Sequence, residues 1–141
     1  MAKVAVIYWT GTGNTEQMAE LIANSAKAAG AEVDLFNISD GEPSIDGYDV
    51  LALGCPAMGD EELEEGEFEP FYAGIEDSLN GRKVALFGSY SWADGAWMTT
   101  WNERATAKGA VLVTESLIQF EAPDEEGTAK CEAFGQALAN A

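Results

Sequence analysis

Short apolar segments alternate with longer amphipathic segments along the whole chain, and this alternation constrains the fold more than any other feature. Uniformly apolar runs of five or six residues are typical of strands in a parallel sheet that is covered on both faces. The predicted strands are 4–9, 33–38, 49–54, 84–88 and 111–113, the last continuing after an interruption through Leu117 and Ile118.

Helical spacing occupies the intervals between these strands. After Asn14, the residues Met18, Leu21 and Ile22 recur on one helix face, and Gly30 is placed to end that helix. The other predicted helices span about 68–79, 96–108 and 124–140. Five strands interleaved with four helices predict a doubly wound α/β sheet with right-handed crossovers and helices on both faces.

The size and composition suit one domain, which we expect to span 1–141. The 141 residues are 47% hydrophobic, enough for a core that needs no disulfide. Cys55 and Cys131 form neither a CxxC pair nor a metal cluster, so we expect two ordinary semi-buried thiols and a cytoplasmic location. No apolar run approaches the ~18 residues that cross a bilayer, and no export signal is evident.

The charge balance and the residue types exclude several functions. Lys and Arg number 7 against 25 Asp and Glu, a formal charge of −18, which disfavours binding to nucleic acid and to anionic membranes. The chain has no histidine, which excludes Ser-His-Asp and Cys-His catalysis in their ordinary forms.

The loop after the first predicted strand has the composition of a phosphate site. Its glycines let the backbone wrap closely, its hydroxyl and amide groups can donate hydrogen bonds, and it opens a helix N-terminus. It lacks the lysine of a Walker A loop, and Glu16 stands where a dinucleotide fingerprint needs a glycine. A polar turn with N-capping threonines is the alternative. The candidate phosphate ligands are Thr10, Gly11, Thr12, Gly13, Asn14 and Thr15.

The segment 8–15, Tyr-Trp-Thr-Gly-Thr-Gly-Asn-Thr, resembles the FMN-phosphate signature of flavodoxins, particularly the short-chain kind. Two further segments strengthen the resemblance, 54–61 (Gly-Cys-Pro-Ala-Met-Gly-Asp-Glu) and 87–95 (Phe-Gly-Ser-Tyr-Ser-Trp-Ala-Asp-Gly). All three follow apolar strands, so they lie at the carboxyl edge of the sheet. The resemblance covers essentially the whole chain and implies the strand order 2-1-3-4-5, with FMN between the ends of the first and third strands.

The resemblance also implies roles for individual residues around the flavin ring. Met58 lies against the inner part of the ring, Trp92 packs on its outer face, and Glu61 accepts a hydrogen bond from the ring N3–H. The Gly59-Asp60 peptide turns its carbonyl towards N5 when one electron is added. The other implied contacts are Pro56, Ala57, Ser89, Tyr90, Ser91, Ala93 and Gly95.

Residue patterns alone leave simpler interpretations open at several of these positions. Trp92 and Met58 could be core residues, and Gly59 could serve only a tight turn. Ser91 and Ala93 stand where glycines are common in the family, which leaves the hydrogen bonds near N1 in doubt. Pro56 replaces a serine that binds phosphate in some members.

An acidic run follows the third predicted strand and allows two interpretations. Such a run is usually a solvated face, but carboxylates near a flavin disfavour the anionic reduced form and lower its potential, and they steer the protein to basic partners. Both effects can coexist. The acids are Asp60, Glu61, Glu62, Glu64, Glu65, Glu67 and Glu69.

The function implied by the resemblance is electron transport and not catalysis. The chain is expected to be a monomeric, low-potential one-electron carrier whose non-covalent FMN cycles between semiquinone and hydroquinone, substituting for ferredoxin. Expected partners are ferredoxin or flavodoxin reductases and low-potential oxidoreductases with basic docking patches. The alternative is an FMN-dependent NAD(P)H oxidoreductase, although no dinucleotide site is evident. A response regulator is disfavoured because no aspartate ends the third strand, and a phosphatase because no arginine follows Cys55 until Arg82.

Overall fold

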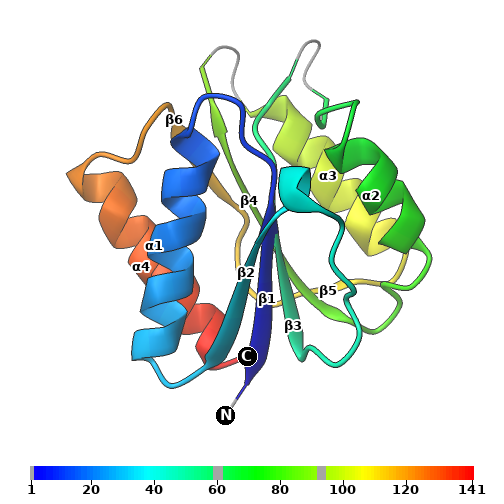
Figure 1. The fold of residues 1–141 in the computed structure, drawn as a ribbon, viewed down its shortest axis with the longest axis horizontal. Helices are drawn as coiled ribbons and strands as arrows, with labels where there is room; N and C mark the ends of the chain where they lie inside the picture. The colour runs from blue at the N-terminus through cyan, green and yellow to red at the C-terminus, as the bar shows by residue number, and fades with distance from the viewer. Residues whose placement is uncertain (1, 59–61, 92–94) are drawn as a thin grey trace.

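The computed structural model describes residues 2–58, 62–91 and 95–141 (Figure 1). Strands and helices alternate as the sequence predicts. In chain order the elements are β1 (Lys3–Tyr8), α1 (Asn14–Ala28), β2 (Glu32–Asn37), the short 3-10 helix η1 (Ile38–Asp40), β3 (Val50–Gly54), α2 (Phe68–Glu76), β4 (Lys83–Tyr90), α3 (Ala96–Ala107), β5 (Val111–Leu112), β6 (Leu117–Phe120) and α4 (Glu125–Ala139).

The strands form one parallel sheet in the order β2-β1-β3-β4-β5, and β6 also pairs with β4. This confirms the predicted topology. From β1 the chain adds β2 on one side and then β3, β4 and β5 on the other. The strand order therefore reverses between β1 and β3. The carboxyl ends of these two strands are therefore neighbours.

The predicted fifth strand is two separate segments, so the described residues form six strands where the sequence predicted five. Leu112 pairs with Val84, whereas Leu117 pairs with Phe87. Four residues of the outer segment, 113–116, thus lie opposite only two residues of β4, 85–86. The two additional residues interrupt the hydrogen-bond ladder with β4. The interruption expected from the sequence is this change of register.

Two smaller boundaries also differ from the prediction. β4 continues through Ser89 to Tyr90, because β6 pairs with its last four residues. Helix α2 ends at Glu76, and the N–H of Leu79 donates to the Glu76 carbonyl across a tighter turn instead of extending the helix.

Alternate residues of each strand supply two cores, one on each face of the sheet. On β1, Val4 and Val6 face helices α1 and α4, whereas Ala5 and Ile7 face α2 and α3. Figure 1 shows these two helix pairs on opposite sides of the sheet. Trp97 and Trp101, each 1% exposed, belong to the core under α2 and α3.

Both cysteines are fully buried and unpaired, more deeply than the semi-buried state we expected. Cys55 belongs to the core under α2 and α3, and Cys131 to the core under α1 and α4. Burial raises the pKa of both thiols, that of Cys131 to about 11. Over the described ranges, none of the helices combines the length and the apolarity needed to cross a bilayer.

Candidate cofactor site

The three segments singled out in the sequence lie side by side at the carboxyl edge of the sheet. The N–H of Trp9 donates to the Gly54 carbonyl over 3.0 Å, and the N–H of Cys55 donates to the Phe87 carbonyl over 3.1 Å. These bonds join the ends of β1, β3 and β4. In Figure 1 these strand ends point to the upper edge of the molecule.

The first loop closes into a turn that leaves a helix end open. Gly13 has φ 96°, a left-handed conformation that side-chain-bearing residues rarely adopt, and its N–H donates to the Thr10 hydroxyl over 3.0 Å. No side chain among the described residues caps α1, and nothing there accepts a hydrogen bond from the N–H groups of Asn14, Thr15 and Glu16. Such an open helix N-terminus fits a phosphate ester.

Ser89 joins the first loop to the other two. Its hydroxyl oxygen is 2.8 Å from that of Thr15, and both side chains are buried, 4% and 1% exposed. Its carbonyl accepts a hydrogen bond from the Ala57 N–H over 3.0 Å. One residue at the end of β4 therefore fixes the start of α1 and the segment after β3 in one arrangement.

The second loop leaves β3 through a buried stretch and then folds back on itself. Ala57 is 6% exposed, whereas Pro56 and Met58 are half-buried. Met58 and Glu62 exchange both backbone hydrogen bonds, at 3.0 and 2.9 Å, in an antiparallel bridge. The predicted ring contacts Gly59, Asp60 and Glu61 lie outside the described residues, but this bridge fixes the spacing of the residues on either side of them.

The third loop follows β4 and is anchored on both sides. Tyr90 is half-buried with its ring centroid 5.9 Å from that of Trp97, and Ser91 is exposed. The Trp97 indole N–H donates to the Cys55 carbonyl over 3.2 Å, and Gly95 starts α3 with φ 90°. Trp92 and Ala93, expected at the outer face and the pyrimidine edge of the ring, lie outside the described residues.

The acidic segment is largely exposed, but three of its carboxylates also make specific contacts. The Glu64 carboxylate accepts hydrogen bonds from the N–H groups of Gly66, Glu67 and Phe68 at 2.6, 2.7 and 2.9 Å. Partial burial raises the pKa of Glu64, but these three donors outweigh it and lower that pKa below 4.5. Phe68 is the first residue of α2, so the Glu64 carboxylate satisfies one of the N–H groups that open this helix.

Glu67 connects the acidic segment to the first loop. One of its carboxylate oxygens accepts hydrogen bonds from the Trp9 indole N–H at 3.0 Å and from the Ser39 hydroxyl at 2.9 Å. Trp9 in turn covers Gly11, where an added Cβ would lie 3.0 Å from the indole ring. These contacts between distant segments have no local sequence signal.

Glu69 pairs with Arg104 on α3. The guanidinium donates to both oxygens of Glu69, at 2.6 and 2.7 Å, and to Glu76 at 2.6 Å, and it lies 4.8 Å from the centre of the Tyr72 ring. Hydrogen bonding to Glu69 raises the pKa of Arg104 above its ordinary value despite partial burial. Arg104 thus offsets part of the negative charge near the second loop.

The first strand contributes a further polar contact below the phosphate loop. The Tyr8 hydroxyl donates to Glu16 over 2.9 Å. Burial, together with the hydrogen bond to Glu16 and its charge, raises the pKa of Tyr8 to about 12. The phenol therefore stays protonated at neutral pH and continues to donate to Glu16, a residue of the first turn of α1.

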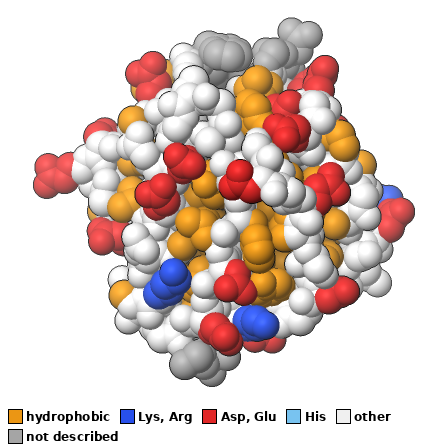
Figure 2. Space-filling view, in the orientation of Figure 1, with side chains coloured by type: hydrophobic (Ala, Val, Ile, Leu, Met, Phe, Trp, Pro, Cys, Tyr) orange, Lys and Arg blue, Asp and Glu red, His pale blue; other side chains and the backbone are white. Residues whose placement is uncertain are grey.

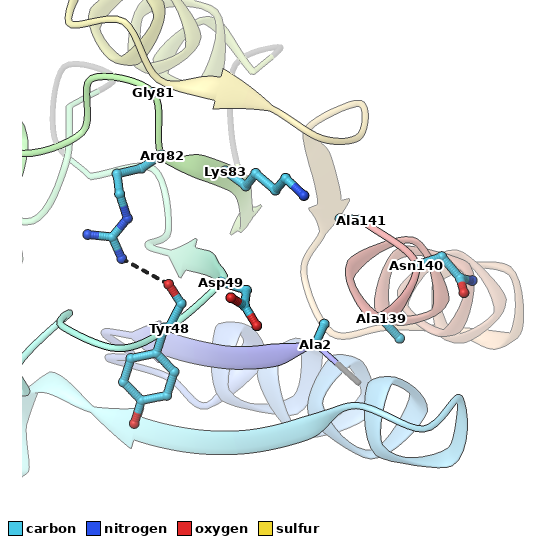
Figure 3. Close-up of a pocket in the computed structure, with 9 residues that line it drawn as sticks. All are labelled: Ala2, Tyr48, Asp49, Gly81, Arg82, Lys83, Ala139, Asn140 and Ala141. Atoms are coloured by element: carbon cyan, nitrogen blue, oxygen red, sulfur yellow. Dashed lines mark hydrogen bonds between the residues drawn. The ribbon is translucent and has the colours of Figure 1, made fainter.

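A cavity of about 690 Å³ lies at the opposite edge of the sheet (Figure 3). None of the predicted site residues lines it. The Arg82 guanidinium donates to the Ile45 and Tyr48 carbonyls and so holds the segment before β3. The lining residues are Ala2, Tyr48, Asp49, Gly81, Arg82, Lys83, Ala139, Asn140 and Ala141.

The fold and the site together define a class. A doubly wound parallel sheet with an open helix N-terminus at the point where the strand order reverses is the arrangement of α/β proteins that bind a phosphate-bearing cofactor. The flavodoxin family model matches residues 6–135. The chain belongs to the flavodoxin family.

Sequence and structure comparisons agree on this assignment. The chain is 50% identical over 138 residues to the flavodoxin of Clostridium beijerinckii, covering 96% of this chain and 98% of that protein. It is 43% identical over 139 residues to the flavodoxin of Megasphaera elsdenii, covering 98% and 99%. The solution structure of that flavodoxin in its two-electron reduced form superimposes with a TM-score of 0.87, covering 98% of this chain and 99% of the other.

Proposed function

We propose that this chain binds FMN non-covalently and acts as a low-potential one-electron carrier that can substitute for ferredoxin. The observation that supports it best is the open N-terminus of α1, which follows the left-handed Gly13 and adjoins the buried Thr15–Ser89 pair. FMN, when bound, supplies the one-electron redox chemistry. The chain supplies the binding site, the electrostatic field and the docking surface, and it is not an enzyme by itself.

The phosphate of FMN would be held by neutral donors only. Thr12, exposed at the loop tip, and the N–H groups that open α1 are free to donate, and the helix dipole favours an anion there. The Thr10 hydroxyl accepts from Gly13 and keeps its own proton for the ligand. The proposed phosphate ligands are Thr10, Gly11, Thr12, Gly13, Asn14, Thr15 and Ser89.

The ring would lie between the second and third loops. Met58, half-buried beside the bridge to Glu62, supports this placement, as does the contact of Tyr90 with the core through Trp97. Trp92 as the outer wall, Glu61 as the acceptor from N3–H and the Gly59-Asp60 peptide as the partner of N5 remain proposals. So do the contacts of Pro56, Ala57, Ser91, Ala93 and Gly95.

Negative charge near the ring would set the low potential. A carboxylate ~10 Å from the reduced, anionic flavin disfavours it by roughly 1.7 kcal/mol at an effective dielectric near 20, less in salt. The Glu64 N–H donates to the Cys55 sulfur in the second loop, and the Glu67 carboxylate accepts from Trp9 in the first loop. The positive charge of Arg104 opposes theirs. Figure 2 shows acidic side chains spread over the visible face with few Lys and Arg among them.

The same charge favours redox partners with basic docking patches, such as ferredoxin or flavodoxin reductases and low-potential oxidoreductases. We further propose that the chain is one domain, works as a monomer and is cytoplasmic.

For an FMN-dependent NAD(P)H oxidoreductase, a cation would have to receive the nucleotide phosphate. Arg104, which lines a small cavity with Glu62 and Trp97, is already paired with two glutamates.

An anaerobic redox titration of the purified protein, followed by absorption, tests the proposal. We expect one FMN per chain and two separate one-electron steps, the second at low potential. NADH and NADPH should be oxidised only when a reductase is added. A protein that binds no FMN would refute the proposal, and rapid oxidation of NADPH without a reductase would replace it with the enzymatic alternative.

A further inference from the structure

Phe120 exposes an aromatic ring at the edge of the sheet that holds the proposed cofactor site. It is the last residue of β6 and pairs in register with Tyr90, the last residue of β4. Its side chain is 53% exposed, more than any other large hydrophobic residue in the described ranges. The ring contacts that of Tyr90 edge to face, with centroids 5.5 Å apart, and Tyr90 directly precedes the third loop.

The backbone around Phe120 holds the ring in this exposed position. Glu121 has φ 56° and is the non-glycine residue with a positive φ in the described part of the chain. This conformation, disfavoured for a residue with a Cβ, is fixed by a 2.8 Å hydrogen bond from the Glu121 N–H to the Tyr90 carbonyl. The Gln119 side chain also donates to the Phe120 carbonyl, over 3.0 Å.

Exposed acidic residues follow Phe120 closely in the chain. Glu121, Asp124, Glu125 and Glu126 are all exposed, and the sequence has no Lys or Arg between Lys108 and Lys130. An exposed aromatic residue next to exposed charges has the composition of an interface anchor, where an apolar centre supplies affinity and charged residues supply orientation and speed of association.

We propose that Phe120 is the apolar anchor of the surface on which the electron-transfer partner docks. The partner that fits is a basic redox protein with a shallow apolar depression rimmed by Lys and Arg near its own redox centre. This proposal rests on the carrier function proposed above. A second copy of this chain does not fit the surface, because each copy has a formal charge of −18.

Two other exposed hydrophobic residues serve as controls for the position of Phe120. Val111 is 49% exposed and pairs with Lys83 at the amino edge of the sheet, away from the site loops. Leu35 is 38% exposed on β2, the opposite edge strand. Neither residue adjoins the loops, so their truncation should not affect docking.

The test uses FMN-loaded protein and cytochrome c, a basic haem protein, as the probe. In each turnover the reduced flavoprotein loses one electron and one ferric haem becomes ferrous. Stopped-flow measurements at several ionic strengths give the second-order rate constant, and calorimetry of the two oxidised proteins at low salt gives the dissociation constant. The variants are Phe120→Ser, Phe120→Leu, Val111→Ser and Leu35→Ser, each checked for FMN affinity and melting temperature.

We expect Phe120→Ser to lower the rate constant and weaken binding by at least about fivefold at every ionic strength, with an unchanged salt slope. Phe120→Leu should recover most of both, and the control variants should match the unaltered protein. If Phe120→Ser reduces cytochrome c and binds it as well as the unaltered protein does, the docking proposal is wrong and the carrier function stands. If the unaltered protein binds no FMN, the carrier function itself fails.

Discussion

The hydroxyl groups of Thr15 and Ser89 are 2.8 Å apart although 74 residues separate them in the chain. Thr15 belongs to the first turn of α1 and Ser89 to the last residues of β4. Because the Ser89 carbonyl also accepts from Ala57, this pair sets the relative positions of all three site loops. The phosphate loop is thus held from beneath by a buried bond, while its exposed donors face outward.

Thr15→Val should therefore affect both folding and cofactor binding. Removing the hydroxyl leaves the buried Ser89 without its partner, which we expect to destabilise the protein without FMN by about 1–3 kcal/mol and to weaken FMN binding. Thr12→Ala is the matched control, because Thr12 is exposed and makes no hydrogen bond within the described residues. It should weaken FMN binding and leave the unfolding midpoint in urea unchanged. Equal stability of the two variants would contradict this role for Thr15.

The stabilising contribution of Glu64 should be lost in acid. The folded state holds its pKa below the ordinary value of 4.5, so its contribution is complete above the pKa of the unfolded chain and is lost as pH falls through the folded-state pKa. Glu64→Gln should cost about 1–2 kcal/mol at pH 7, and the difference from the unaltered protein should shrink on acidification below 4.5. Urea unfolding at a series of pH values measures this.

Glu65→Gln is the control for that experiment, since Glu65 is exposed and makes no hydrogen bond in the described ranges. Its stability should follow that of the unaltered protein at each pH. A pH-independent cost for Glu64→Gln would show that the carboxylate charge has no part in the cap.

Arg104→Met should destabilise the protein much more than Lys108→Met. Arg104 is 30% exposed and its loss leaves Glu76, 13% exposed, without a counter-charge, which we expect to cost about 1–3 kcal/mol. The Lys108–Asp77 pair is 43% and 86% exposed, so water and salt screen it and its loss should change stability little. Thermal melts in low and high salt compare the two variants.

Arg104→Met should also lower the midpoint potential of the second electron, because it removes a positive charge beside the acidic segment. Spectroelectrochemical titration measures this shift, with Lys108→Met as reference. A potential that stays constant would mean that Arg104 acts only on stability.

Gly88 and Gly74 should respond oppositely to alanine. At Gly88 an added Cβ would lie 2.2 Å from the Cys55 carbonyl oxygen, which is backbone and cannot yield without separating β3 from β4. We expect Gly88→Ala to cost about 3 kcal/mol or more. At Gly74, within α2, nothing lies within 4 Å, and Gly74→Ala should stabilise by about 0.5–1 kcal/mol. Urea denaturation ranks both against the unaltered protein, and a neutral Gly88→Ala would contradict the close approach.

Periodicity and turn chemistry determined much of this protein before its tertiary structure was considered. Alternation of apolar runs with helical spacing predicted the α/β class, and Gly13 with its threonine neighbours predicted a loop for an anion. These features depend on residues close together in the chain, so the sequence contains them directly. The interruption of the last strand was also visible, as the polar residues between Val113 and Leu117.

Only the tertiary structure decided which distant groups meet. The acids after β3 look alike in the sequence, yet Glu64 caps α2, Glu67 holds Trp9 and Glu69 pairs with Arg104. Phe120 reads as an ordinary strand residue, and only the pairing of β6 with the end of β4 places it, exposed, beside Tyr90. Such contacts depend on how strands and helices pack, and packing joins segments that no local pattern relates.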